Sequence, residues 1–382
     1  MKVLLIRTSS AENTIFKNIY NEQEVGLAKA LTRLGHECGI VYYARKGNAS
    51  QQEVDVDDKK IKIYNIEGKE FCKSAIYNKK IYDLCEEYDI IQVYECDKVM
   101  TWLINSKYSY KTIIYHGPYE SRFTWKHNLY TKVFYKIFLK RNNYLNAHII
   151  TKSYLAEEYL KKQGFKNVHT IGVGLDTSKF VNKIDDASDN IEFFNKIKKE
   201  DKHLLYIGKI EPRRNIKFLI DLLSDLIKEN DNIKLVLVGN GNSKYIKKMV
   251  KYARNKSVLD SIIYEKSINH NVVQALYEKC DIFLLPTQYE IFGMVLLEAM
   301  YFGIPTITTL NGGSSVLIEN GKNGYVCDLQ DRKIWKSTII NILNNNNNSL
   351  SLIAKSTIQN NYVWEKLVYQ FTKEYKGECN EK

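Results

Sequence analysis

The chain has 382 residues, of which 44% are hydrophobic and 26% are charged, an ordinary composition for a globular protein. That length exceeds what one hydrophobic core usually serves, so we expect two domains. The formal net charge of +12 indicates an anionic partner, which is nucleic acid, an acidic membrane surface or a phosphate-bearing substrate.

The seven cysteines are scattered and none forms a C-x-x-C pair, which argues against a disulfide framework and against a zinc site. Reduced thiols in a cytoplasmic compartment are therefore expected. The opening "MKVLLIRTSS" has too short an apolar run for a signal peptide and predicts a first β-strand. No run approaches the roughly 18 apolar residues that span a bilayer.

Short apolar strands alternate with amphipathic segments along the first part of the chain. A helix over 24–35 carries Val25, Ala28 and Leu31 on one face and ends at Gly35. Strands are predicted at 2–6, 38–43, 61–66, 89–94, 111–116, 147–151 and 168–172. The alternation predicts a parallel sheet covered by helices on both faces.

The same alternation starts again after a polar linker at 181–202. Strands are predicted at 203–208, 233–239, 261–265, 281–286, 304–309 and 324–328, with helices at 215–229, 243–254, 271–279 and 293–302. The prediction is an α/β protein of two doubly wound, Rossmann-like domains, 1–180 and 203–361. The apolar stripe of the last helix, 362–378, predicts packing against the first domain.

Two carboxylates lie in one of the most apolar stretches, "PTQYEIFGMVLLEAMYFGIPTI". Glu290 follows a predicted buried strand, and Glu298 lies about one turn into the next helix. Ligands of open parallel sheets bind at the carboxyl ends of strands. The amides of Phe292, Gly293 and Met294 begin the helix, where an anion is favoured. The alternative is that both carboxylates are ion-paired structure, since buried Glu needs a partner.

Cations follow another strand of the same predicted sheet. Gly208 ends that strand, and Lys209, Arg213 and Arg214 lie in "GKIEPRRNI" after it. Lysine and arginine suit a diphosphate, although a solvated basic loop is the alternative. Gly239 in "LVGNGN" follows a further strand, but the glycine pattern is incomplete for a dinucleotide fingerprint, which disfavours a nicotinamide dehydrogenase.

Five segments together resemble the retaining glycosyltransferases of family 4. "YEIFGMVLLEAM" resembles their Glu-x7-Glu motif, and "GKIEPRRNI" resembles "GRLxPxKG", with Lys209 at the Arg position and Arg214 at the Lys position. The other matching segments are 26–37, 171–180 and 301–328. The resemblance implies a GT-B fold, in which two Rossmann-like domains face each other across a cleft.

The resemblance also implies roles for the residues of the donor site. Lys209 and Arg214 neutralise the leaving nucleoside diphosphate, where charge develops. Glu290 binds a hydroxyl of the donor sugar, and Glu298 accepts hydrogen bonds from the ribose. His116, at the end of a strand in the first domain, corresponds to a histidine that faces the donor sugar.

The resemblance implies that no metal or other cofactor is needed. It also implies that the leaving phosphate itself helps to deprotonate the acceptor hydroxyl, so that no side chain need act as a general base. The chain departs from the family in the 8–22 loop, where Asn18 and Ile19 stand in place of two glycines, with Asn21 as a further polar candidate. Asn215 also replaces the usual glycine. "DVDD" at 55–58 contains a metal-type Asp-x-Asp, but in a loop far from the cations in sequence, which disfavours a metal role.

Basic and aromatic residues are interleaved over 122–144, including Trp125, Tyr130, Phe134 and Lys132. Such a helix lies on an anionic membrane surface, or it buries its aromatic face in the core and leaves its lysines in water. The first interpretation predicts a protein bound peripherally to the inner face of the plasma membrane.

The predicted function is transfer of a sugar from a nucleotide-sugar donor, UDP- rather than GDP-linked by family frequency, to a glycan or lipid-linked acceptor in surface polysaccharide synthesis. The alternative enzymatic function is that of a sugar-nucleotide epimerase with the GT-B fold. A nucleic-acid-binding protein is the alternative from another class, but no zinc, RRM-type or helix-turn-helix signature supports nucleic acid as a partner.

Overall fold

The computed structural model describes all residues except 11–22, 72–73, 181–189, 270–271, 346–347 and 378–382. The chain forms two compact units. Unit 1 consists of Met1–Asp176 together with Val363–Lys382, and unit 2 is Thr177–Tyr362. Each unit is built around a sheet of its own.

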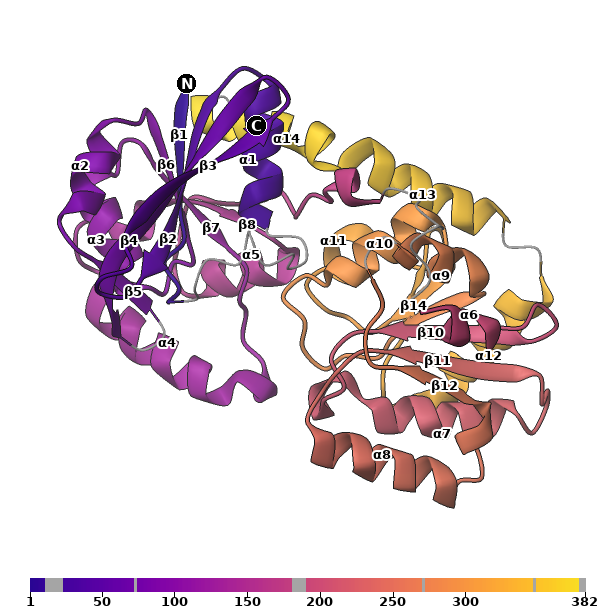
Figure 1. The fold of residues 1–382 in the computed structure, drawn as a ribbon. Coiled ribbons are helices and arrows are strands. Elements are labelled where there is room, and N and C mark those ends of the chain that lie inside the picture. The colour runs from indigo at the N-terminus through magenta and orange to yellow at the C-terminus, as the bar shows by residue number, and fades with distance from the viewer. Residues whose placement is uncertain (11–22, 72–73, 181–189, 270–271, 346–347, 378–382) are drawn as a thin grey trace. The chain divides into compact units, whose positions relative to one another are not determined.

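The sheet of unit 1 has, within the described residues, the strand order β3-β4-β2-β1-β6-β7-β8-β9. Its parallel strands are β1 (Lys2–Ile6), β2 (Glu37–Ala44), β4 (Lys59–Phe71), β6 (Ile90–Tyr94), β7 (Thr112–His116), β8 (His148–Thr151) and β9 (Val168–Thr170). The chain runs from β1 toward β2 on one side and from β6 toward β9 on the other (Figure 1). The order of the strands therefore reverses between β1 and β6, where α/β sheets bind ligands.

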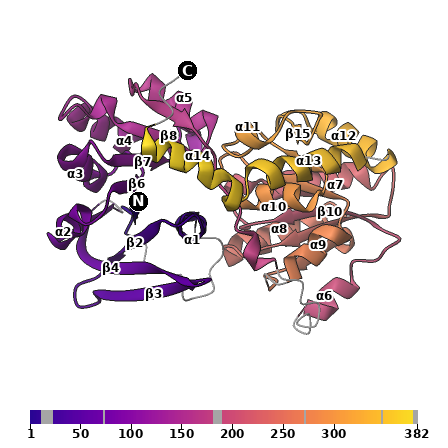
Figure 2. The ribbon, with the colours of Figure 1, turned by 90° about the horizontal axis from the view of Figure 1, so that it is seen from above.

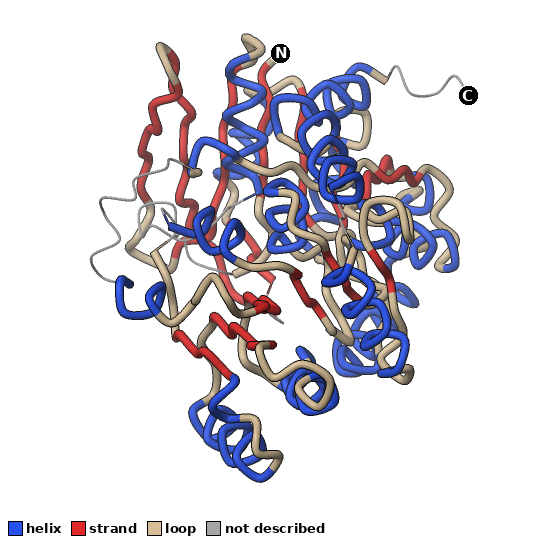
Figure 3. Tube along the Cα trace, turned by 90° about the vertical axis from the view of Figure 1, so that its right-hand side faces the viewer, coloured by secondary structure: helices blue, strands red, loops and turns tan. Residues whose placement is uncertain are grey.

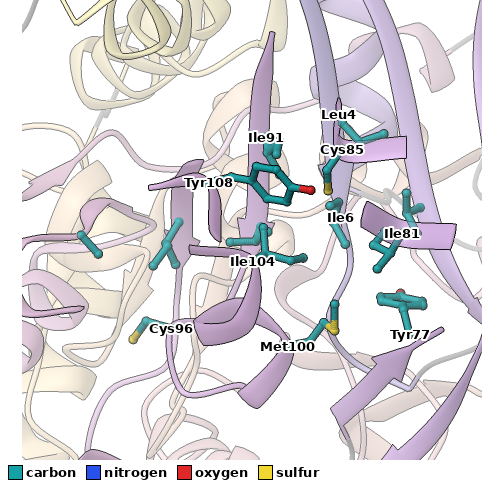
Figure 4. Packing of buried hydrophobic residues seen from close by; sticks show 14 of the residues in the cluster. Leu4, Ile6, Tyr77, Ile81, Cys85, Ile91, Cys96, Met100, Ile104 and Tyr108 are labelled. Atoms are coloured by element: carbon teal, nitrogen blue, oxygen red, sulfur yellow. The ribbon is translucent and has the colours of Figure 1, made fainter. Parts of the chain in front are cut away.

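Helices cover both faces of this sheet. On one face α1 (Gln23–Arg33) contacts α14 (Trp364–Lys376), while α2 (Lys80–Glu86) and α3 (Val99–Tyr108) cover the other (Figures 1 and 2). Two further helices are α4 (Trp125–Phe138) and α5 (Tyr154–Lys162). In Figure 4, Leu4 and Ile6 of β1 lie in one buried cluster with Ile104 of α3. The alternating side chains of a central strand thus fill the core that these helices close.

The sequence analysis did not predict two antiparallel strands, β3 (Ser50–Val56) and β5 (Ser74–Tyr77). Both strands pair with β4. β3 is a polar, mostly exposed edge strand, so it lacks the apolar pattern that marks a strand. The Asp-x-Asp segment was therefore wrongly assigned to a loop. Asp55 lies in β3 opposite Lys60, and Asp57 adopts a left-handed turn (φ 53°) with an ion pair to Arg33.

Unit 2 is also a doubly wound α/β unit, and within the described residues its sheet is entirely parallel, in the order β12-β11-β10-β13-β14-β15. The strands are β10 (Lys202–Ile207), β11 (Ile233–Val238), β12 (Ile262–Glu265), β13 (Ile282–Leu285), β14 (Thr306–Thr308) and β15 (Tyr325–Val326). The helices are α6 (Ile191–Asn195), α7 (Ile216–Leu226), α8 (Ser243–Asn255), α9 (Val273–Lys279), α10 (Met294–Phe302), α11 (Ser314–Leu317), α12 (Arg332–Asn344) and α13 (Asn348–Asn361).

Strands and helices alternate along the chain, as Figure 3 shows by colour, which confirms the predicted class of two Rossmann-like domains. In unit 2, α7 and α8 lie on one face of the sheet, and α9 and α10 lie on the other (Figure 1). No helix in the described part of the chain combines the length and the apolar character needed to cross a bilayer.

Trp364 anchors the last helix to unit 1. Its backbone N–H donates to the carbonyl of Leu175 at 3.1 Å, and its side chain is 2% exposed. A Cβ atom on Gly26 or on Gly174 would overlap the indole ring, so both glycines leave the space that the ring fills.

We predict that Trp364→Ala lowers the free energy of unfolding of unit 1 by about 3–5 kcal/mol, because it deletes a fully buried aromatic side chain. Urea unfolding followed by circular dichroism measures this loss. The matched control is Trp125→Ala, whose side chain is 61% exposed and should change stability by no more than about 0.5 kcal/mol. Equal losses in the two variants would contradict the proposed anchor.

Candidate active site

The strand order of unit 2 reverses between β10 and β13, which are neighbours in the sheet. The chain passes from β10 to β11 and β12 on one side, and from β13 to β14 and β15 on the other. The segments that follow β10 and β13 therefore leave the same edge in opposite directions, which opens the crevice where parallel sheets bind ligands. Lys209 and Arg214 follow β10, and Glu290 follows β13.

Gly208 and Gly239 stand side by side where β10 and β11 end. Both have positive φ angles, 152° and 154°. A Cβ atom on Gly239 would overlap the carbonyl oxygen of Gly208. Glycine is required at position 239 because the two backbones approach closely at the edge of the sheet.

Asn215 ties the segment after β10 to the segment after β13. It adopts a left-handed conformation with φ 53° at the end of a 3-10 turn (Pro212–Arg214). Its side-chain amide donates to the carbonyl of Pro286 at 2.7 Å, and its oxygen accepts from the side chain of Gln288 at 3.0 Å. Asparagine tolerates this conformation better than most residues, which explains its presence where the family usually has glycine.

The centre of the crevice is an ion pair between Arg214 and Glu290. Arg213 lies 3.6 Å from the same carboxylate and also donates to the carbonyl of Tyr289 at 2.6 Å. Arg214 is buried, and its Nε and Nη1 atoms have no hydrogen-bond partner among the described residues. A buried guanidinium with unused N–H groups is suited to hold an anion in a bidentate contact.

Lys209 is exposed at the start of the same segment, where its carbonyl accepts from the hydroxyl of Tyr206 at 2.8 Å. The structure thus brings Lys209, Arg214 and Glu290 to one sheet edge.

Two glycines that the sequence analysis did not single out hold the Glu290 segment in place. The N–H of Gly312 donates to the carbonyl of Glu290 at 3.0 Å. A Cβ atom on Gly312 would overlap the carbonyl of Ile291, and one on Gly313 would overlap that of Phe292. The Gly-Gly pair in the segment 301–328 was the available signal, since paired glycines mark a close approach of two backbones.

Gly293 precedes α10 with φ 87°, a left-handed conformation that glycine adopts without strain. The first amides of α10, from Met294 onward, have no partner within the helix because they lie at its N-terminus. The side chain of Phe292, by contrast, is buried at 2% exposure. The backbone of 292–294, rather than its side chains, is what this helix start can offer to an anion.

Glu298 lies deeper than the other predicted site residues. Its side chain is 1% exposed, one carboxylate oxygen accepts from the hydroxyl of Tyr277 in α9 at 3.2 Å, and the other has no hydrogen-bond partner among the described residues. Burial raises the pKa of Glu298 well above its usual value. Glu298 and Glu290, eight positions apart in the sequence, therefore differ strongly in environment.

His116 ends β7 in unit 1 and is 1% exposed. Its Nδ1 atom lies 3.0 Å from the carboxylate of Glu95, which also accepts from the N–H of Gly117 and lies 3.6 Å from Lys152. Burial opposes the charge of Glu95, but Lys152 and His116 lower its pKa to about 2. Burial likewise lowers the pKa of His116, whereas Cys96 and Glu95 raise it, and the raising contributions prevail.

His116 belongs to a group of three side chains whose types can bind a metal ion. Ligand atoms of Glu95, Asp97 and His116 lie within 4.8 Å of one another. However, Lys152 lies 3.6 Å from Glu95 and Lys98 lies 3.6 Å from Asp97. These two ammonium groups already offset both carboxylates, so the arrangement favours an ion-pair network over a bound cation. Asn18, Ile19 and Asn21 of the 8–22 loop lie outside the described residues.

Known proteins resemble this chain in sequence and in fold. Residues 187–359 match the family model "Glycosyl transferases group 1". Over 177 residues the chain is 27% identical to the N-acetyl-alpha-D-glucosaminyl L-malate synthase of Bacillus anthracis, covering 46% of this chain and 45% of that protein. The matched region spans less than half the length of the curated relatives.

Two solved structures match over almost the whole chain. The sucrose-phosphate synthase of Thermosynechococcus elongatus has a TM-score of 0.74 at 16% identity, covering 99% of this chain and 98% of that one. Anabaena HepE, crystallised with UDP-glucose, has a TM-score of 0.68 at 16% identity, covering 99% and 100%. At this identity the likeness concerns the fold, which is the predicted GT-B fold. Through residues 187–359 the chain resembles the group 1 glycosyl transferases, in agreement with the resemblance of its sequence motifs to family 4.

Proposed function

We propose that the protein is a retaining glycosyltransferase that moves a sugar from a nucleotide-sugar donor, preferably UDP-linked, to a glycan or lipid-linked acceptor in surface polysaccharide synthesis. The observation that carries the proposal is the ion pair of buried Arg214 with half-buried Glu290 at the strand-order reversal of unit 2. The family match supports the reaction class. The HepE neighbour, which was crystallised with UDP-glucose, supports the choice of donor.

The donor diphosphate would lie against the segment after β10. Arg214 has two unused N–H positions for phosphate oxygens, and exposed Lys209 adds a mobile point charge. The backbone N–H groups at the start of α10 complete the anion site, and Gly208 and Gly239 let the ligand approach the sheet edge closely. As the bond to the sugar breaks, these groups stabilise the negative charge that develops on the leaving phosphate.

Glu290 would bind a donor-sugar hydroxyl, and Glu298 would accept from the ribose. Both roles suit carboxylate oxygens, because a sugar offers hydroxyl donors that neighbouring cations cannot accept. The family resemblance assigns His116 to the donor sugar, and Glu95 would fix its ring through the 3.0 Å contact to Nδ1. No side chain is assigned as a general base, because the leaving phosphate can take the acceptor proton in this family.

We predict that UDP-glucose raises the melting temperature of the wild-type protein more than GDP-mannose or ADP-glucose does. A ligand at about 100 times its dissociation constant stabilises the state that binds it by about 2.7 kcal/mol. Differential scanning fluorimetry with all three donors measures this shift. No shift with any donor would overturn the proposed function, and a shift only with GDP-mannose or ADP-glucose would replace the preferred base.

We predict that Lys209→Ala slows the release of UDP from UDP-glucose by about 100-fold or more, the loss typical when one group stabilising developing charge is removed. Glu290→Gln should slow it as well, because an amide oxygen accepts a hydrogen bond from the donor-sugar hydroxyl less strongly than a carboxylate does. Glutamine keeps the shape of Glu290, so Arg214 is not left facing a cavity. The readout is a coupled UDP assay, with Lys248→Ala, another exposed lysine of unit 2, as the control. Rates near wild type in the first two variants would remove them from the site.

We propose further that α4 holds the protein on an anionic membrane, at the inner face of the plasma membrane. The predicted aromatic face is in part wrong, because Phe134 and Tyr135 are buried in the core of unit 1. A second apolar stripe faces outward instead: Trp125, Leu129, Val133 and Ile137 are 61%, 59%, 53% and 45% exposed. Exposed lysines at 126, 132 and 136 flank it, an arrangement that suits an anionic lipid surface.

We predict that replacing Trp125, Leu129 and Val133 together by serine abolishes co-sedimentation with vesicles of phosphatidylglycerol and phosphatidylcholine, because the apolar contact with the acyl region is lost. Tyr110→Ser, which removes another exposed aromatic side chain of unit 1, should leave binding unchanged. Wild-type protein that sediments equally with neutral vesicles, or with none, would contradict the membrane proposal.

A further inference from the structure

The carboxyl group of Glu298 is fully buried in unit 2. A carboxylate that is fully buried needs hydrogen bonds or a cation to remain ionised. In the described residues, one oxygen of Glu298 accepts a single hydrogen bond and the other accepts none. No charged group contributes to its pKa, for which burial is the sole cause.

The groups on the neighbouring elements confirm this isolation within the described part of unit 2. α9 offers the hydroxyl of Tyr277, and β14 offers only the uncharged side chains of its Thr306–Thr308 stretch. Lys355 of α13 also packs against α10, but it lies beside Gly303, at the C-terminal end of that helix. The cations Arg213 and Arg214 are paired with Glu290 ahead of the helix.

The hydroxyl of Tyr277 can form a hydrogen bond with Glu298 in either of its protonation states. Its hydroxyl lies 3.2 Å from a carboxylate oxygen of Glu298 and 3.3 Å from the carbonyl of Val295. When Glu298 is protonated, its O–H can donate to the tyrosine oxygen while the tyrosine donates to Val295. When Glu298 is ionised, the tyrosine can turn its one hydrogen toward the carboxylate.

The ring of Tyr277 cannot easily leave this position. It is 2% exposed, stacks on Phe302 with ring centroids 5.3 Å apart, and meets Phe283 edge-on at 6.1 Å. The hydroxyl is therefore held beside Glu298 by packing that does not involve the carboxylate.

We propose that Glu298 is protonated in the free protein and ionised in the donor complex, so that donor binding releases a proton, and that Tyr277 is the positioning residue that permits the exchange. The inference rests on the proposed function. Ribose hydroxyls would supply the hydrogen bonds that the second oxygen of Glu298 lacks, and these bonds stabilise the ionised form. The proton passes from the carboxyl group to the solvent, and no covalent bond of the ligand changes.

The sign of the pH dependence follows from linkage. Because the complex binds one proton fewer than the free protein, affinity for the donor rises with pH until Glu298 is ionised in the free protein as well. Below that point the dissociation constant should fall by up to about tenfold for each pH unit. Tyr277→Phe removes the one hydrogen bond to the ionised form, so the profile should move to higher pH by about one to two units.

The test is titration calorimetry of the full chain with UDP-glucose, in two buffers of different ionisation enthalpy, over a series of pH values. UDP-glucose is preferred over UDP because its diphosphate is a diester and does not titrate near neutral pH. The wild type should show a buffer-dependent enthalpy, which measures released protons without any substitution. Glu298→Gln should bind more weakly and lose the pH dependence that Glu298 contributes.

Tyr252→Phe is the matched control, because its hydroxyl also donates to a carboxylate of unit 2, that of Asp221 at 2.6 Å. It should keep the wild-type profile. Binding of UDP-glucose with no proton release, or a Tyr277→Phe profile equal to that of the wild type, would overturn this inference alone. Absence of binding by the wild type would overturn the proposed function and this inference with it.

Discussion

The ion pair between Arg214 and Glu290 is the constraint on which the arrangement of the crevice depends. Removing two charges from water is costly, and their attraction offsets that cost only where the geometry is good and further hydrogen bonds are made. Here the surrounding backbone provides the geometry. Asn215 bonds the segment after β10 to Pro286, and Gly312 bonds the Glu290 segment from its other side. The segments that carry the two charged side chains are thus held by contacts that do not depend on the ion pair.

Stability alone does not account for this pair. A buried ion pair can often be replaced by apolar residues of similar volume without loss of stability. The Nε and Nη1 atoms of Arg214 also have no partner in the described residues, which adds to its cost. The unpaired N–H groups of Arg214 lower the stability of the fold, and they lie where the strand order reverses. A ligand that accepts hydrogen bonds from them explains their presence better than a role in stability does.

The sequence predicted what depends on local pattern. The buried parallel strands were found because they are short apolar runs, and α10 was found because Gly293 and Gly303 bracket an apolar segment. β3 was missed because a polar edge strand has no apolar period. The contact of Arg214 with Glu290, the depth of Glu298 and the Gly312 contact depend on how separate segments pack, which spacing along one chain does not specify. In α4 the sequence could not distinguish which of two apolar faces turns inward, since both have helical spacing.

The two glutamates of the Glu-x7-Glu motif show how one residue type takes two roles. Glu290 meets the guanidinium of Arg214, whereas Glu298 is buried beside the neutral hydroxyl of Tyr277. Because a second carboxylate at the crevice would repel a diphosphate, a Glu298 that stays neutral until the ribose arrives keeps the field there positive for the approach of the donor. In the proposed proton release, the depth of Glu298 contributes to donor recognition, since a shallower carboxylate would be ionised in advance and would weaken that field.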